Sequence, residues 1–288
     1  MTKTFLLGAG CQKGGTTWLY QYLARSPQFA HGYRKEYHVL DSLDLPSEEQ
    51  ARKRLLARAA EQITGDPEPG NRLAATSAHR LSMFLDQQFY FDYFTGLLHR
   101  TPDTRVAADM TPSYGMLPVE RFEAVRDGFA RRGVRTLPVF LMRDPVERIW
   151  SQARMHARLY KRHEAARAEE ITEYVAANYT RPAYAARTAF DETIRKLDAV
   201  FGPDDVYYGF YERLFTEAET RRLCAMAGVD YVEPDFDQRV HFSPKTSELP
   251  EDTVRTIAEH YRGVYAAVAE RFPDIPLTDI WPSSRYVL

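Results

Sequence analysis

A glycine-rich turn that joins an apolar segment to a helix-forming segment is the feature that most constrains this chain. Residues 4–8 read TFLLG, and the stretch GAGCQKGGTTWLYQYL runs from Gly8 to Leu23. Pro27 ends a helical pattern of large apolar side chains, namely Trp18, Leu19, Tyr22 and Leu23. This order of strand, glycine turn and helix is the context of a phosphate-binding loop, because the N–H groups and dipole of a helix N-terminus favour an anion.

The loop departs from the nucleoside-triphosphate motif G-x-x-x-x-G-K-[ST] in the position of its lysine. Thr16 stands where that motif has lysine, and the lysine of the loop is Lys13. Gly14 and Gly15 let the backbone approach a ligand closely, and Thr17 adds a second hydroxyl beside that of Thr16. A ligand with one 5′-phosphate and a terminal sulfuryl group needs less positive charge and no metal. The loop therefore fits 3′-phosphoadenosine 5′-phosphosulfate (PAPS) better than ATP, the alternative being a tight turn with its lysine in solvent.

A second candidate anion site lies in LMRDPVERIWSQ, residues 141–152. Asp144 is placed to cap a helix that begins at Pro145. Arg143 would lie at the carboxyl end of a strand, where open α/β sheets bind ligands, and Ser151 follows about two helical turns later. An arginine fork and a hydroxyl suit a phosphate, although they could also be a helix-start residue and a packed serine. Together with the first loop, this site implies a nucleotide phosphorylated at its 3′ and 5′ positions.

The rest of the pattern predicts an α/β fold, a single P-loop-like domain with a central parallel β-sheet flanked by helices. We expect strands at 4–8, 29–33, 105–110, 136–142 and 205–210. We expect further helices at about 46–64, 80–98, 118–131, 145–165, 184–201, 215–228 and 250–271. No repeat or linker divides the 288 residues, so we expect one domain over 1–288, with a helical insertion at about 44–100.

Composition excludes several classes of protein. The net charge of −2 gives no basic field for a nucleic-acid partner. No apolar run approaches the length of about 20 residues that crosses a bilayer. Two cysteines cannot form a disulfide framework or a four-ligand zinc site, so we expect no metal and a reduced, cytoplasmic setting. The sequence does not indicate the oligomeric state.

With both anion motifs, the chain resembles the PAPS-dependent sulfotransferase family, and its carbohydrate and bacterial branches more than its aryl branch. QKGGTTWLYQYL is similar to the family's 5′-phosphosulfate loop, which implies nucleotide contacts from Lys13 through Trp18. RDPVERIWS is similar to its 3′-phosphate motif, which implies contacts from Arg143 and Ser151. SPKTSELP resembles the family's C-terminal loop, which implies that Lys245 closes over the 3′-phosphate.

Two further segments resemble the acceptor side of carbohydrate sulfotransferases. RKEYHVLD is similar to their K-E-x-H-x-x-D segment, which implies that Glu36 is the general base, with His38 as its rival or partner. Charge pattern alone favours the alternative that Glu36 is a surface carboxylate paired with Lys35 or Arg34. DMTPSY resembles their acidic-Lys-[ST]-Pro-x-Tyr element, but Met110 stands where lysine is common. Any role of that lysine is then absent or supplied from elsewhere, for example by Lys35.

The resemblance implies in-line transfer of a sulfuryl group from PAPS to a hydroxyl, or secondarily an amine, of a small-molecule or carbohydrate acceptor. Lys13 would stabilise the leaving phosphate of the product, 3′,5′-adenosine bisphosphate. One alternative is a P-loop kinase of a small metabolite, which needs Mg²⁺ and an aspartate such as Asp144 to bind it. The other is a protein that binds a 3′,5′-bisphosphorylated nucleotide without turnover. The sequence leaves the acceptor unidentified.

Overall fold

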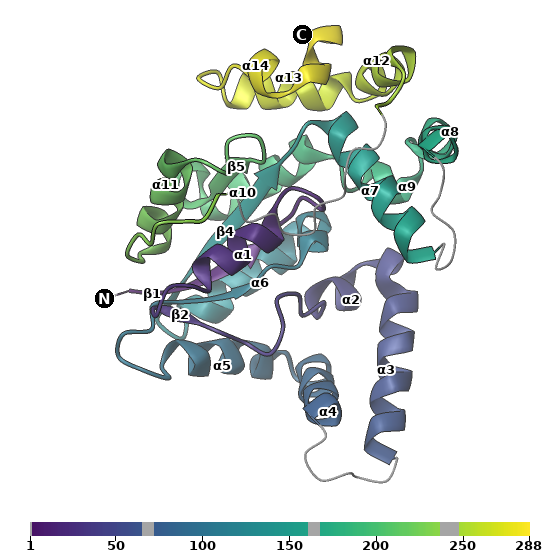
Figure 1. The fold of residues 1–288 in the computed structure, drawn as a ribbon. Helices are drawn as coiled ribbons and strands as arrows, with labels where there is room; N and C mark the ends of the chain where they lie inside the picture. The colour runs from purple at the N-terminus through teal and green to yellow at the C-terminus, as the bar shows by residue number, and fades with distance from the viewer. Residues whose placement is uncertain (1, 65–71, 161–167, 237–247) are drawn as a thin grey trace.

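Five parallel strands form one sheet in this computed structural model, which describes residues 2–64, 72–160, 168–236 and 248–288. The strands lie in the order β2-β3-β1-β4-β5 (Figure 1). Their bounds are β1 Lys3–Gly8, β2 Phe29–Ala30, β3 Val106–Asp109, β4 Val134–Met142 and β5 Tyr207–Phe210. Each neighbouring pair is parallel, and each strand overlaps a segment expected from the sequence. The predicted parallel α/β architecture is therefore confirmed.

Helices connect and flank these strands. Their bounds are α1 Thr16–Leu23, α2 Leu40–Asp44, α3 Glu49–Thr64, α4 Arg72–Leu85, α5 Gln87–Leu98, α6 Val119–Ala130, α7 Pro145–Tyr160, α8 Ala168–Asn178, α9 Pro182–Ala185, α10 Phe190–Phe201, α11 Glu217–Ala227, α12 Glu251–His260, α13 Arg262–Arg271 and α14 Leu277–Ile280. Short 3-10 turns are η1 Pro46–Glu48, η2 Pro112–Met116, η3 Pro203–Asp205 and η4 Pro282–Tyr286. In the part of the chain that the structure describes, no helix is both long and apolar enough to cross a membrane.

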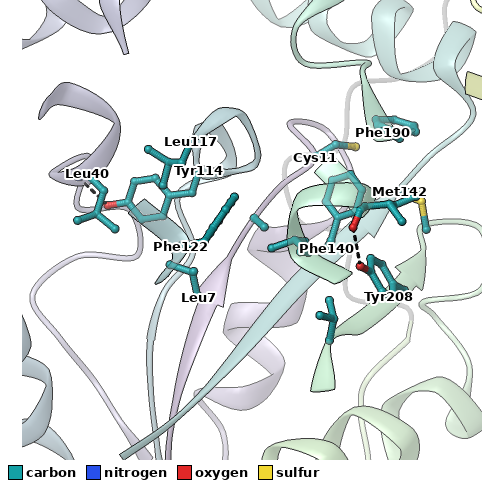
Figure 2. Packing of buried hydrophobic residues seen from close by; sticks show 14 of the residues in the cluster. Leu7, Cys11, Leu40, Tyr114, Leu117, Phe122, Phe140, Met142, Phe190 and Tyr208 are labelled. Atoms are coloured by element: carbon teal, nitrogen blue, oxygen red, sulfur yellow. Dashed lines mark hydrogen bonds between the residues drawn. The ribbon is translucent and has the colours of Figure 1, made fainter. Parts of the chain in front are cut away.

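Successive side chains of a strand point to opposite faces of the sheet, so apolar strand residues contribute to two separate cores, one on each face. Leu6 on β1 faces a cluster built from α1 and α11. Phe5 and Leu7 face the larger cluster, which includes side chains from α5, α6 and α10. Figure 2 shows part of this larger cluster, with Tyr114 of η2 beside the sheet and its hydroxyl at the backbone of Leu40. The sheet is thus covered on both faces, and its carboxyl edge is left for the loops.

The helix boundaries show where the sequence pattern misled. The helix expected at 80–98 is two helices, because the Asp86 carboxylate accepts a hydrogen bond from Gln88 N at 2.8 Å and starts α5 as its N-cap. The segments expected at 184–201 and 250–271 are likewise each split into two helices. Helix α7 begins at Pro145 as expected, but residues 161–165 of its expected length lie outside the described residues.

Helices α3 and α4 lie next to each other and project away from the sheet (Figure 1). They occupy much of the interval 44–100, whereas α5 at its end packs against β3. At the opposite side of the molecule, α12, α13 and α14 form a layer close to the carboxyl end of β5 (Figure 1). The loops after β1, β2, β3 and β4 lie between these two layers and carry the residues of interest.

Candidate active site

The loop after β1 has the geometry of an anion-binding turn. Gly15 caps α1 with φ 95°, a left-handed conformation that glycine adopts without strain. The first hydrogen bond of the helix runs from Leu19 N to the Gly15 carbonyl, at 3.1 Å. The N–H groups of the preceding residues Thr16, Thr17 and Trp18 therefore point out of the helix end. A Cβ on Gly14 would lie 2.6 Å from the Leu141 carbonyl, so the backbone fits closely against β4.

Arg143 joins the second predicted anion site directly to this loop. Its Nη1 donates to the Lys13 carbonyl at 3.2 Å, and its Nη2 lies 3.3 Å from the Glu147 carboxylate. The guanidinium also lies over the Tyr211 ring, 4.3 Å from its centroid. Its Nε–H is buried with no hydrogen-bond partner among the described residues. An arginine held in this way beside the loop has N–H groups beyond the two that are bonded, and these suit an anionic ligand.

The other residues predicted for the nucleotide have mixed placements. Ser151 is 8% exposed and lies about 9 Å along α7 from Pro145, at 1.5 Å per residue. The Trp18 ring is 5% exposed and packs in an aromatic stack with Tyr22, with centroids 5.6 Å apart. Trp18 therefore offers a ligand its backbone rather than its ring. Lys245 lies outside the described residues.

Asp144 is used by the fold and is not free to bind a metal. One carboxylate oxygen accepts from Val146 N at 2.9 Å, the N-cap bond that the sequence predicted. That oxygen also accepts from the Tyr265 hydroxyl, and the other accepts from Ser283 N, both at 2.9 Å. The residue is fully buried, and burial raises the pKa of its carboxyl above the usual range. This geometry disfavours the kinase alternative, which required Asp144 for Mg²⁺.

The segment after β2 places Lys35 between the loop and Glu36. Lys35 Nζ lies 3.1 Å from Thr16 Oγ1, 3.0 Å from Thr17 Oγ1 and 2.6 Å from Glu36 Oε1. The Lys35 carbonyl accepts from Met110 N at 2.9 Å, so the segment is fixed at the end of β3. The Met110 side chain itself is fully buried in the core. Lys35 thus brings a positive charge to the loop beside the position where the resembling element has lysine.

Glu36, His38 and Asp41 form a chain of charges on the same segment. His38 Nε2 lies 3.4 Å from Glu36 Oε2, and His38 Nδ1 lies 2.7 Å from Asp41 Oδ2. Asp41 is fully buried and also accepts a hydrogen bond from the Ser113 hydroxyl. Sequence reasoning gave Asp41 no role, although it closes the quoted segment RKEYHVLD. The signal that could have found it is its position three residues after His38.

The charges in this chain fix which group can accept a proton. Burial raises the pKa of Glu36, but the His38 hydrogen bond and the Lys35 charge outweigh it and lower the pKa to about 2. Burial lowers the pKa of His38, but its bonds to Asp41 and Glu36 raise it to about 10. At neutral pH the pair is therefore a carboxylate and an imidazolium. Both imidazolium N–H groups have carboxylate partners, so His38 has no free nitrogen lone pair in this state and Glu36 is the deprotonated member of the pair.

Asp109, at the end of β3, is fully buried and holds the segment after β2 in place by hydrogen bonds. Its buried carboxylate accepts from Tyr37 N at 3.2 Å, Thr111 Oγ1 at 2.6 Å, Tyr90 OH at 3.0 Å and Tyr114 OH at 2.7 Å. Burial raises its pKa to about 6 despite these bonds. Asp109 and Ser113 are both buried and hydrogen-bonded within the protein.

Backbone strain is concentrated at two of the predicted catalytic residues. Among residues 2–64, 72–160, 168–236 and 248–288, two that are not glycine have positive φ: Lys13 at 72° and His38 at 53°. Such conformations cost about 1–3 kcal/mol each and persist where the surroundings enforce them. The hydrogen bond from Arg143 to the Lys13 carbonyl and the bonds from His38 to its carboxylates are such restraints.

Comparisons with known proteins identify the family of the chain. The sequence model described as "Sulfotransferase family" matches residues 6–234. A solved sulfotransferase from Alicyclobacillus acidocaldarius is similar in fold, with TM-score 0.56, 19% identity, and 94% of this chain and 95% of that chain covered. The sulfotransferase domain of the Synechococcus PCC 7002 olefin synthase gives TM-score 0.48 and 17% identity, covering 91% and 94%. No curated protein matches in sequence. Because the family model covers most of the chain, the protein belongs to the sulfotransferase family.

Proposed function

We propose that this protein transfers a sulfuryl group from PAPS to a hydroxyl, or to an amine, of a small-molecule or carbohydrate acceptor. The observation that carries the proposal is that the donor loop and Glu36 both contact the ammonium of Lys35. Lys35 Nζ contacts both loop hydroxyls and the Glu36 carboxylate, so the candidate donor loop and the candidate base belong to one site. In-line transfer needs these two parts to lie close together on either side of the reacting group.

The residues of the loop fit a donor with phosphates at both ends of its ribose. The N–H groups at the start of α1, together with Lys13, suit the 5′-phosphosulfate. The guanidinium of Arg143, with N–H groups beyond its two bonds, and the hydroxyl of Ser151 suit the 3′-phosphate. When bound, PAPS supplies the sulfuryl group: the acceptor oxygen bonds to sulfur as the bond between sulfur and phosphate oxygen breaks, and 3′,5′-adenosine bisphosphate leaves.

The chain's own residues then have distinct tasks. Glu36 accepts the proton of the acceptor hydroxyl and later releases it to water. His38, held by Asp41 at 2.7 Å, orients Glu36 and is a positioning residue. Lys13 offsets the negative charge that develops on the leaving phosphate. No metal is needed for any of these tasks.

A transfer assay with radiolabelled PAPS and a panel of hydroxyl and amine acceptors tests this proposal. We expect transfer by the natural protein, none by Lys13→Ala, and a loss of about 100-fold or more in Glu36→Gln. Glu36→Gln is expected to keep its affinity for 3′,5′-adenosine bisphosphate, measured by calorimetry. Glu123→Gln, an exposed change on α6, is the matched control and should behave as the natural protein.

Two other results would redirect the assignment. Binding of ATP–Mg²⁺ without binding of 3′,5′-adenosine bisphosphate supports a kinase. Tight binding of the bisphosphate with no transfer to any acceptor supports the non-catalytic binder.

A further inference from the structure

Two cations, Lys35 and His38, contact the candidate base Glu36 and lower its affinity for a proton. Glu36 Oε1 lies 2.6 Å from Lys35 Nζ, and Glu36 Oε2 lies 3.4 Å from His38 Nε2. Both positive charges stabilise the carboxylate and make it a weak proton acceptor. His38 has a second carboxylate partner in Asp41, so its charge is fixed in place. Among the described residues, Glu36 is the one carboxylate within 4 Å of Lys35.

The other contacts of Lys35 are with the donor loop. Its ammonium has three N–H groups, and its three close contacts are Glu36 Oε1, Thr16 Oγ1 and Thr17 Oγ1. The two hydroxyls are neutral acceptors at the start of α1, where the helix end favours an anion. The Lys35 side chain is 17% exposed, and its contacts with Thr16 and Thr17 place its ammonium at the loop. An oxyanion at this helix end would offer Lys35 a stronger partner than either hydroxyl.

We propose, resting on the proposed function, that Lys35 is the cation that contacts the sulfuryl oxygens of the donor, and that donor binding withdraws its charge from Glu36. Lys35 then links the two halves of the site. Before the donor arrives, Lys35 keeps Glu36 ionised and weakly basic. Once the donor is bound, its negative charge offsets the ammonium, and Glu36 becomes a better proton acceptor.

Lys35 stands in the right place for this role because of one backbone contact. Met110 N donates to the Lys35 carbonyl at 2.9 Å, and this places residue 35 beside the end of β3. The side chain at position 110 is fully buried and uncharged, so it brings no charge to the site. The neighbouring segment supplies the cation instead. The groups that face Glu36 and set its proton affinity are Lys35 and His38, with Asp41 acting through His38.

The coupling is reciprocal, so it can be measured without turnover. If the donor raises the proton affinity of Glu36, protonation of Glu36 must raise donor affinity by the same factor. The test uses the full chain, PAPS and 3′,5′-adenosine bisphosphate as probes, and the variants Lys35→Met and Lys35→Arg. Lys53→Met is the matched control, because Lys53 is an exposed lysine with its own glutamate partner at 2.8 Å, far from the loop in sequence.

The first readout is calorimetry of both nucleotides. We expect the natural protein and Lys53→Met to bind PAPS more tightly than the bisphosphate. In Lys35→Met this preference should fall by about tenfold or more, the loss expected for one charge-assisted hydrogen bond. Lys35→Arg should restore part of it. An unchanged preference in Lys35→Met overturns the proposal.

The second readout is the titration of the Glu36 carboxyl by NMR with ¹³C-labelled glutamate. PAPS should raise the pKa of Glu36 in the natural protein and leave it unchanged in Lys35→Met. A pKa of Glu36 that does not respond to PAPS in the natural protein overturns the coupling. Failure of the proposed function is a different result, because then neither nucleotide binds to the natural protein.

Discussion

Glu212 gives the protein a stability that falls with rising pH, and replacing it by glutamine is expected to remove that dependence. The carboxylate lies just after β5, where Glu212 Oε1 accepts from Asp144 N at 3.2 Å and Oε2 accepts from Trp281 Nε1 at 3.1 Å. Burial raises the pKa of Glu212 to about 7, and nearby Asp144 adds to this, although hydrogen bonds and Arg143 oppose it. These bonds connect the C-terminal helices to the strand end that carries Arg143.

The sign and size of the effect follow from the shift. Because the folded pKa of about 7 lies above the ordinary value of 4.5, the folded protein holds a proton that the unfolded chain has released. This contribution to stability is fully present below pH 4.5 and is lost as the pH rises through 7. Between pH 5 and pH 8 the loss amounts to about 2.5 kcal/mol, at 1.36 kcal/mol for each pKa unit.

Urea unfolding at pH 5, 6, 7 and 8 measures this contribution. The free energy of unfolding of the natural protein should fall by about 2.5 kcal/mol more over this range than that of Glu212→Gln. Using the difference between the two proteins cancels the groups that titrate in both. Glu123→Gln, an exposed change, should follow the natural protein. Parallel curves for the natural protein and Glu212→Gln would show that Glu212 is not protonated in the fold, and would refute the reasoning.

Three further predictions follow from the site. Gly14→Ala places a Cβ 2.6 Å from the Leu141 carbonyl and should abolish nucleotide binding by calorimetry, whereas Gly96→Ala, with nothing within 4 Å, should bind normally. Asp109→Ala leaves four hydrogen-bond donors without their acceptor and should lower the free energy of unfolding by at least about 3 kcal/mol in urea; a loss below 1 kcal/mol contradicts the assigned network. The pKa of about 10 keeps His38 protonated, so the pH profile of kcat/KM should show no limb near 6.5; such a limb, absent in His38→Gln, would make His38 the base.

Local signals explain the parts of the fold that the sequence predicted well. The strand, turn and helix around Lys13 follow from apolar periodicity and glycine spacing within about 20 residues. The N-cap at Asp144 follows from the residue types beside Pro145. The break between α4 and α5 was missed, because apolar residues continue on both sides of Asp86 and conceal its capping role. An N-cap aspartate inside an apolar pattern is a weaker signal than the pattern itself.

The geometry of the site arises from contacts between segments far apart in the sequence, which local sequence patterns do not predict. Lys35 meets Thr16 and Thr17 because the segment after β2 is fixed at the end of β3, and β3 lies next to β1. The resemblance assigned Glu36 and His38 to one site, but it could not show that both nitrogens of His38 face carboxylates. Arg143 was predicted at a second anion site, and its bond to the Lys13 carbonyl shows that this site adjoins the first.

A comparison of two nucleotide affinities tests the central claim most directly, namely that Lys13 and Arg143 hold the two ends of one donor. Calorimetry should show that 3′,5′-adenosine bisphosphate binds at least about tenfold more tightly than 5′-AMP, because a 3′-phosphate adds charge-assisted bonds. In Arg143→Ala this difference should disappear while 5′-AMP binding remains. Equal affinities for the two nucleotides in the natural protein would contradict the account.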